Sequence, residues 1–129
     1  MIVLDASAAV KLLGGTPAGK NVAGWLQGER LLHAPHLIDL EVLSALRRQA
    51  ALGSIGEERT TQALALFQDL QILRYPHYPY LQRICQHRNQ ITVYDACYLA
   101  LTEALNATLL TCDTALRSAR LSRGEVEVV

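Results

Sequence analysis

The chain has 129 residues, of which 50% are hydrophobic and 19% are charged. This balance is that of a folded protein with one core and excludes a disordered chain, so we expect a single domain spanning residues 1–129. Twelve basic and twelve acidic side chains cancel, and the net charge therefore excludes a strongly basic nucleic-acid-binding protein. Any surface for a charged partner has to be a local patch.

Cysteine usage and hydropathy indicate a cytoplasmic protein. The three cysteines show no C-x-x-C spacing, which argues against a zinc site and a disulfide framework and favours reduced thiols. No apolar stretch approaches the ~18 residues of a membrane-spanning helix. The first apolar run lacks a basic leader and contains Asp5, so we expect neither a signal peptide nor a membrane anchor.

Short apolar runs alternate with longer helical segments along the chain. Strands are expected at 2–5, 30–33, 71–75 and 107–113, with an edge strand at 125–129. Helices are expected at 5–13, 17–28, 35–52, 60–70, 80–88, 91–105 and 114–120. Their starts are marked by Thr16 before Pro17, by the capping-box spacing of Ser54 and Glu57, and by Thr92. This alternation predicts a three-layer α/β/α sandwich with a central, mainly parallel sheet of four or five strands.

Three acidic residues stand where a parallel sheet places its ligands, beyond a strand end or at a helix start. Asp5 follows the first strand, Asp113 follows the fourth, and Asp95 lies in the first turn of a helix. Each also has a local explanation. Asp5 and Asp113 could cap the helices that they precede, and Asp95 has capping-box spacing with Thr92.

A fourth acid, Glu41, has no such local explanation. It lies in the apolar segment LIDLEVLSAL, where a lone carboxylate is costly unless another group satisfies it. Asp39 is about 200° away around the same helix, so the two cannot face one spot. Periodicity leaves open which of them points inward, and an exposed stripe is the simpler expectation for Asp39.

Taken together, these acids predict a metal site. Carboxylates that converge at one end of a sheet repel one another, and a divalent ion relieves that repulsion. Oxygen ligands without a cluster of Cys or His favour Mg²⁺ or Mn²⁺. Because such an ion can activate water and neutralise charge on a phosphodiester, the pattern indicates metal-assisted phosphodiester hydrolysis.

Four motifs follow one another along the chain: D-A-S-A at 5–8, a helix with Glu41 followed by L-R-R at 46–48, Y-D-A-C-Y-L-A-L at 94–101, and L-L-T-C-D at 109–113. Together they resemble the PIN domain and, more closely, the VapC-type ribonuclease toxins of prokaryotic toxin–antitoxin pairs. The resemblance covers essentially the whole chain in length, motif order and spacing. The segment 74–90 matches no motif of the family.

The resemblance implies which residues form the site. The acidic quartet of the family falls on Asp5, Glu41, Asp95 and Asp113. Asp5 and Asp95 would be the principal metal ligands, and the other two would complete the cluster. Ser7 and Thr111 match small hydroxyl positions that would orient carboxylates or waters. Ordinary polarity at a helix start and a strand end explains these two hydroxyls equally well.

The resemblance also implies a substrate and partners. It implies endonucleolytic cleavage of RNA by a metal-activated water, a homodimer, and inhibition by a small antitoxin of the VapB type whose tail occupies the acidic groove. Four arginines could meet RNA phosphates, although solvated helix faces explain each of them too. They are Arg47, Arg48, Arg117 and Arg120.

Two alternatives stay open. A metal-independent ribonuclease would use histidines as acid and base. The chain has four of them, His33, His36, His77 and His87, in segments without a partner motif. A catalytically silent PIN-like binding module is the other alternative, and the intact carboxylates at all four positions argue against it.

Overall fold

The fold is built on one five-stranded sheet. The computed structural model describes residues 1–29 and 31–129, which leaves the first residue of the predicted second strand, Arg30, outside the described residues. The strands are β1 (Ile2–Leu4), β2 (Leu32–Pro35), β3 (Ile72–Tyr75), β4 (Thr108–Thr111) and β5 (Glu125–Val128). Their order is β3-β2-β1-β4-β5, and every neighbouring pair is parallel. The predicted α/β sandwich with a parallel sheet is confirmed.

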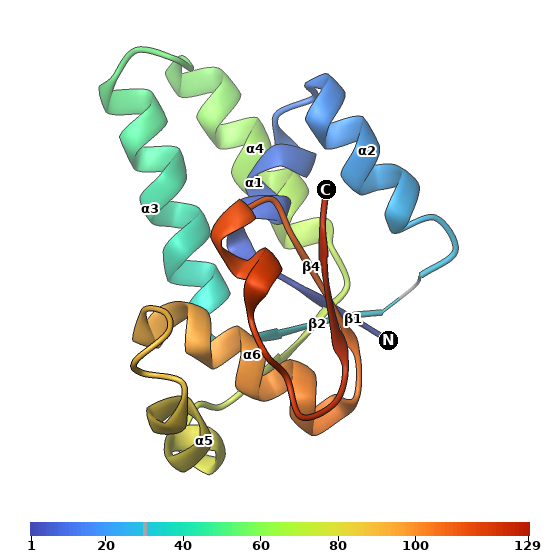
Figure 1. Ribbon diagram of the computed structural model, residues 1–129. Coiled ribbons are helices and arrows are strands. Elements are labelled where there is room, and N and C mark those ends of the chain that lie inside the picture. Colours follow the sequence, from blue (N-terminus) through green and yellow to red (C-terminus); the bar gives the residue numbers. More distant parts are fainter. Residues whose placement is uncertain (30) are drawn as a thin grey trace.

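Helices cover the two faces of this sheet (Figure 1). One side carries α1 (Ala6–Leu13), α2 (Pro17–Trp25), α3 (Leu37–Ala51) and α4 (Glu57–Asp69), and the other carries α5 (Leu81–Gln86) and α6 (Val93–Leu105). Two short 3₁₀ helices complete the described structure, η1 (Tyr78–Tyr80) and η2 (Thr114–Ser118). The chain changes sides after β3 because the sheet then has to grow from the other edge of β1, and right-handed crossovers place α6 on the opposite face.

Some predicted boundaries are wrong. Pro35 ends β2 instead of starting a helix, because the His36 N–H donates to the Tyr75 carbonyl (2.9 Å) and extends the ladder past the proline. The predicted cap at Ser54 is also wrong, since α4 begins after Gly56 and has no side-chain cap. Thr16 and Thr92 do cap α2 and α6 as predicted.

The core lies between the sheet and its two helical layers. Val3 and Leu4 of β1 are fully buried, and so are Leu109 and Leu110 of the neighbouring β4. Helix α6 is buried along most of its length, from 96 to 103, which fits a helix whose sequence is apolar on nearly all sides. Among the described residues, no helix combines the length and hydropathy that crossing a membrane requires.

Candidate active site

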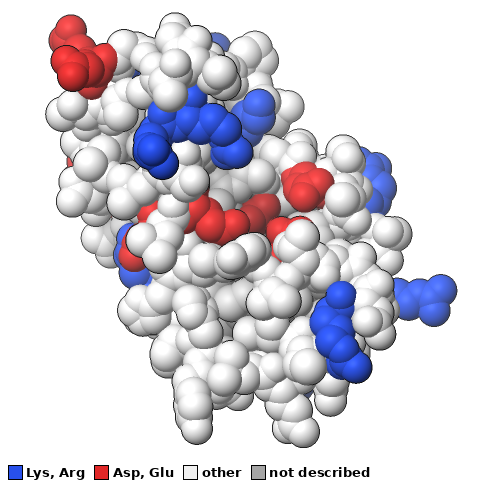
Figure 2. All heavy atoms as spheres, turned by 90° about the vertical axis from the view of Figure 1, so that its left-hand side faces the viewer, with Lys and Arg blue, Asp and Glu red and all other residues white. Residues whose placement is uncertain are grey.

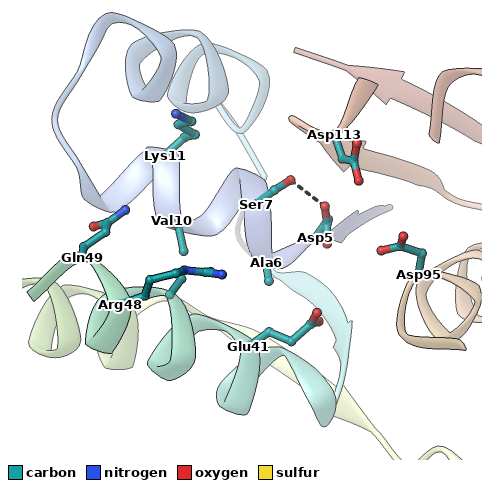
Figure 3. Close-up of a pocket in the computed structure, with 11 residues that line it drawn as sticks. Asp5, Ala6, Ser7, Val10, Lys11, Glu41, Arg48, Gln49, Asp95 and Asp113 are labelled. Atoms are coloured by element: carbon teal, nitrogen blue, oxygen red, sulfur yellow. Dashed lines mark hydrogen bonds between the residues drawn. The ribbon is translucent and has the colours of Figure 1, made fainter. Parts of the chain in front are cut away.

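A cleft of about 350 Å³ opens beyond the ends of β1 and β4, where the strand order reverses. All four acids singled out in the sequence line it: Asp5, Glu41, Asp95 and Asp113. They come from four separate segments, and Figure 3 shows their carboxylates turned toward one another. In Figure 2 the same face shows acidic atoms inside a hollow, with basic side chains along one rim.

Asp5 holds the N-cap position of α1 but does not cap it. The predicted capping hydrogen bond is absent because the carboxylate accepts hydrogen bonds from two hydroxyl groups instead. The Ser7 and Thr111 hydroxyls both donate to Asp5 Oδ2, each at 2.6 Å. Asp5 is only 5% exposed, and its other oxygen has no protein partner among the described residues. That oxygen is therefore available to a ligand in the cleft.

The direction of these two hydrogen bonds is fixed by the Asp5 carboxylate, which can only accept when it is ionised. Ser7 Oγ accepts the Cys112 N–H (2.9 Å), and Thr111 Oγ1 accepts the Asp113 N–H (3.0 Å). Each hydroxyl has a single hydrogen, which it donates to Asp5, and it accepts the backbone N–H through a lone pair. Because both hydroxyl hydrogens point to Asp5, the 3.2 Å contact between the two hydroxyl oxygens is not itself a hydrogen bond. This network locks the Asp5 carboxylate to the turn that follows β4.

Glu41 is satisfied by a residue that the sequence did not single out. The Tyr98 hydroxyl donates to Glu41 Oε1 at 2.7 Å, and the Tyr98 side chain is fully buried. Burial raises the pKa of Glu41, the hydrogen bond from Tyr98 lowers it in part, and the nearby carboxylates of Asp5 and Asp95 raise it further. Tyr98 lies one helical turn after Asp95 in α6, and this spacing was the available signal.

The other two acids lie at helix starts, Asp95 in the first turn of α6 and Asp113 at the N-cap of η2. The Asp95 N–H donates to the Thr92 hydroxyl (3.1 Å) at the start of α6. Burial raises the pKa of Asp95, and a hydrogen bond with Thr92 lowers it in part. Repulsion from the carboxylates of Asp5 and Asp113 raises it further. Asp113 accepts the Ala115 N–H (2.9 Å) and so caps η2, as predicted. The cleft therefore concentrates negative charge that disfavours full ionisation.

The chemistry of this donor set fits a hard divalent cation. Every titratable group that lines the acidic part of the cleft offers oxygen, which Mg²⁺ and Mn²⁺ prefer. Within residues 1–29 and 31–129, no three His, Cys, Asp or Glu side chains lie close enough to form a ready-made ligand cluster. Mg²⁺ usually takes one or two carboxylates and keeps several waters, so carboxylates spaced around a cleft suit a hydrated ion.

The four histidines lie outside the cleft lining. His33 is buried and bonds the Tyr75 hydroxyl through Nδ1 (2.8 Å), and His87 is buried beside Glu103. His77 Nε2 accepts the Leu37 N–H (3.0 Å), and its ring meets that of His36 edge-on. Structural contacts thus account for most of these rings, and their placement does not favour a histidine-based site.

Only one of the four arginines predicted to meet RNA lines the cleft. This is Arg48, whereas Arg47, Arg117 and Arg120 are exposed elsewhere, so their contact with RNA stays a prediction. The structure adds Lys11 and Gln49 to the lining, which sequence reasoning missed.

The unassigned segment 74–90 has a structural role in β3, η1 and α5. Arg74 Nε donates to both carboxylate oxygens of Asp39 (2.8 and 2.9 Å), which orients Asp39 toward β3 rather than toward the cleft. Arg83 forks onto Glu103 of α6 through two 2.6 Å hydrogen bonds. This segment therefore supports the helices that carry the acids.

Comparison with known proteins decides the family. Residues 2–121 match the family model described as PIN domain. The chain belongs to the PIN-domain family. It is 42% identical over 129 residues to ribonuclease VapC12 of Mycobacterium tuberculosis, which covers 100% of this chain and 99% of that protein. The predicted resemblance to the PIN domain and to VapC ribonucleases is confirmed.

Solved structures of PIN-like proteins share the fold. The crystal structure of PAE2754 from Pyrobaculum aerophilum superposes with a TM-score of 0.71 at 23% identity, covering 97% of this chain and 82% of that one. That of VapC20 from Mycobacterium tuberculosis, described as a sarcin-ricin loop cleaving toxin, gives 0.66 at 13% identity, with 95% and 99% covered. At such identities the likeness establishes the architecture alone.

The hydrogen bond between Tyr98 and Glu41 makes a testable prediction about this PIN-domain site. Tyr98→Phe removes the donor, and since a hydrogen bond to a carboxylate lowers its pKa, we expect the pKa of Glu41 to rise. The measurement is an NMR titration of the Glu41 side-chain carboxyl carbon. Tyr75→Phe, which removes a hydroxyl far along β3, is the matched control and leaves the Glu41 titration unchanged. An unshifted titration in Tyr98→Phe would contradict the contact.

Proposed function

We propose that this PIN-domain protein is a Mg²⁺- or Mn²⁺-dependent endoribonuclease and the toxin of a VapBC-type toxin–antitoxin pair, carried by one domain of residues 1–129 in the cytoplasm. The observation that carries the proposal is the gathering of four carboxylates from distant segments in one cleft. The names of its relatives support the activity, since several mycobacterial proteins that match almost their entire length are called VapC ribonucleases.

In this proposal the four acids together hold the divalent ion. Asp5 and Asp95 are the principal metal ligands, and Glu41 and Asp113 complete the cluster. Ser7 and Thr111 fix Asp5 so that its second oxygen faces the cleft. When bound, the divalent ion supplies an activated water and neutralises charge on the phosphodiester. The raised pKa of Glu41 and Asp95 suits residues that gain a cation, because the ion stabilises their ionised forms.

The proposed partners follow from the VapC relatives. We propose an RNA substrate, a small VapB-type antitoxin whose tail occupies the acidic cleft, and a homodimer. The presence of charge of both signs in the cleft suits a tail of mixed charge. Co-expression with the antitoxin and light scattering of the purified protein would test the two assemblies.

Metal dependence and the nature of the product ends test the reaction. We expect purified protein, freed of antitoxin, to cleave total cellular RNA with Mg²⁺ or Mn²⁺ and to lose that activity in EDTA. Because water is the nucleophile, the RNA 2′-OH is not needed, and the products carry no 2′,3′-cyclic phosphate. End analysis of the fragments reads this directly. Cleavage that survives EDTA, or cyclic phosphate ends, would favour the histidine alternative instead.

A further inference from the structure

The acidic cleft has a second, basic end. Besides the four carboxylates, its lining includes Lys11 of α1 together with Arg48 and Gln49 of α3. In Figure 3 the carboxylates lie at one end and these three side chains lie toward the other. The cleft is thus divided by charge along its length.

In the part of the chain that the structure describes, the two cations at this end, Lys11 and Arg48, form no ion pair with the carboxylates beside them. The ion pairs in residues 1–29 and 31–129 are Arg74–Asp39 and the contacts of Arg83 and His87 with Glu103, none of which involves the cleft. Lys11 and Arg48 are both exposed. Two free cations therefore share a cleft with four carboxylates, and neither group neutralises the other through direct contact.

The spacing along the two helices sets the distance between the ends. Lys11 follows Ser7 by one helical turn of α1, and Arg48 follows Glu41 by seven residues of α3, which is about 10 Å of helix axis. A stacked nucleic-acid strand places a phosphate roughly every 3.4 Å of its axis. The basic end therefore lies within a few nucleotides of whatever phosphate sits over the carboxylates.

We infer that Lys11 and Arg48 form a subsite for an RNA phosphate a few nucleotides away from the bond that is cleaved. The inference rests on the proposed ribonuclease function. Arg48 offers a guanidinium fork that matches phosphate oxygens, Lys11 offers a point charge, and Gln49 adds an amide donor. With a cation over the carboxylates and the phosphate on the basic end, the strand would lie along the cleft in one defined path.

A structural explanation competes with this subsite. Lys11 and Arg48 both lie in the last turns of their helices, where a cation interacts favourably with the helix dipole. This explanation predicts that their removal changes only the stability of the fold. The subsite predicts that their removal changes the salt dependence of RNA binding, which a helix dipole does not affect.

The test compares two double variants that remove the same charge. Lys11→Gln with Arg48→Gln empties the basic end, and Lys20→Gln with Arg123→Gln removes one exposed Lys and one exposed Arg outside the cleft. Binding of a short fluorescein-labelled single-stranded RNA of random sequence is followed by anisotropy in EDTA over a KCl series. Urea unfolding of each variant reports stability separately.

We expect the slope of log Kd against log salt to become shallower by about 0.7 for the cleft variant, the value for one lost phosphate contact, and to change much less for the control. Equal slopes in both variants, an unchanged slope in the cleft variant, or no salt-dependent binding by the parent protein would each overturn the subsite. These measurements need neither metal nor cleavage. Failure of the ribonuclease proposal shows instead as parent protein that does not cleave RNA with Mg²⁺ or Mn²⁺.

Discussion

Asp5→Asn is expected to lower RNA cleavage by more than about 100-fold, the upper end of what loss of a mere supporting partner costs at a metal site. The protein should remain folded. The Ser7 and Thr111 hydroxyls donate to the same Asp5 oxygen, so the amide oxygen of asparagine can take its place and accept both. The amide nitrogen would then face the cleft, where it cannot bind a cation.

Two controls make this result specific. Asp39→Asn makes the same change on α3 at a carboxylate that bonds Arg74 outside the cleft, and it should cleave RNA nearly as the parent does. An NMR titration of Asp5→Asn should show a lower pKa for Glu41 and Asp95, because the charge of Asp5 raises both. Cleavage at the parent rate by a folded Asp5→Asn protein would remove Asp5 from the site.

Glu103 is expected to dominate the acid stability of the fold. It is 4% exposed, and burial by itself raises its pKa, but hydrogen bonds from Arg83, the Ser122 N–H and His87 lower it to about 2. Its ordinary value is 4.5. A depressed pKa contributes stability that is fully present above pH 4.5 and is lost as the pH falls toward about 2.

The size of this contribution follows from the pKa difference. The shift corresponds to up to about 3 kcal/mol of unfolding free energy, and the partial exposure of Arg83 makes the lower part of that range the better expectation. Urea unfolding between pH 5 and pH 2 would measure it in the parent and in Glu103→Gln. The variant should be less stable near pH 5, with a weaker loss on acidification.

The matched control for Glu103 is an exposed glutamate. Glu58→Gln, at the first turn of α4, removes the same charge at a residue that forms no ion pair within residues 1–29 and 31–129, and it should keep the acid dependence of the parent. An identical pH dependence in Glu103→Gln and the parent would show that other carboxylates control acid unfolding.

Sequence reasoning located the acids of the cleft because their placement depends on topology alone. Parallel strands end at one edge of a sheet, so residues that directly follow two such strands meet wherever the strands are neighbours. Asp5 and Asp113 follow β1 and β4, which are paired in register from Ile2 to Leu4. Asp95 lies in the first turn of a helix, and a helix that follows a parallel strand begins near this same edge.

The same reasoning could not predict which side chains form hydrogen bonds with those acids. A tyrosine within an apolar helix is typical of core packing, and the bond from Tyr98 to Glu41 spans 57 positions. The capping rule also failed for Asp5, since it considers only the next few N–H groups and not Thr111, 106 positions away. Arg83 lies in the segment that matched no motif of the family, and a buried carboxylate 20 positions later engages it. Rules based on neighbouring residues identify only partners that are close in the sequence, whereas these contacts join residues that are far apart in it.

The pairing of β1 with β4 has a consequence for the timing of activity during translation. Asp5 precedes α1, but the strand and the hydroxyl that fix it belong to a segment that follows α6. A growing chain can pack its early helices, yet it lacks the edge on which the four carboxylates meet until residue 113 has emerged from the ribosome. The cleft that gathers the four carboxylates therefore forms only after the segment that carries β4 has been made.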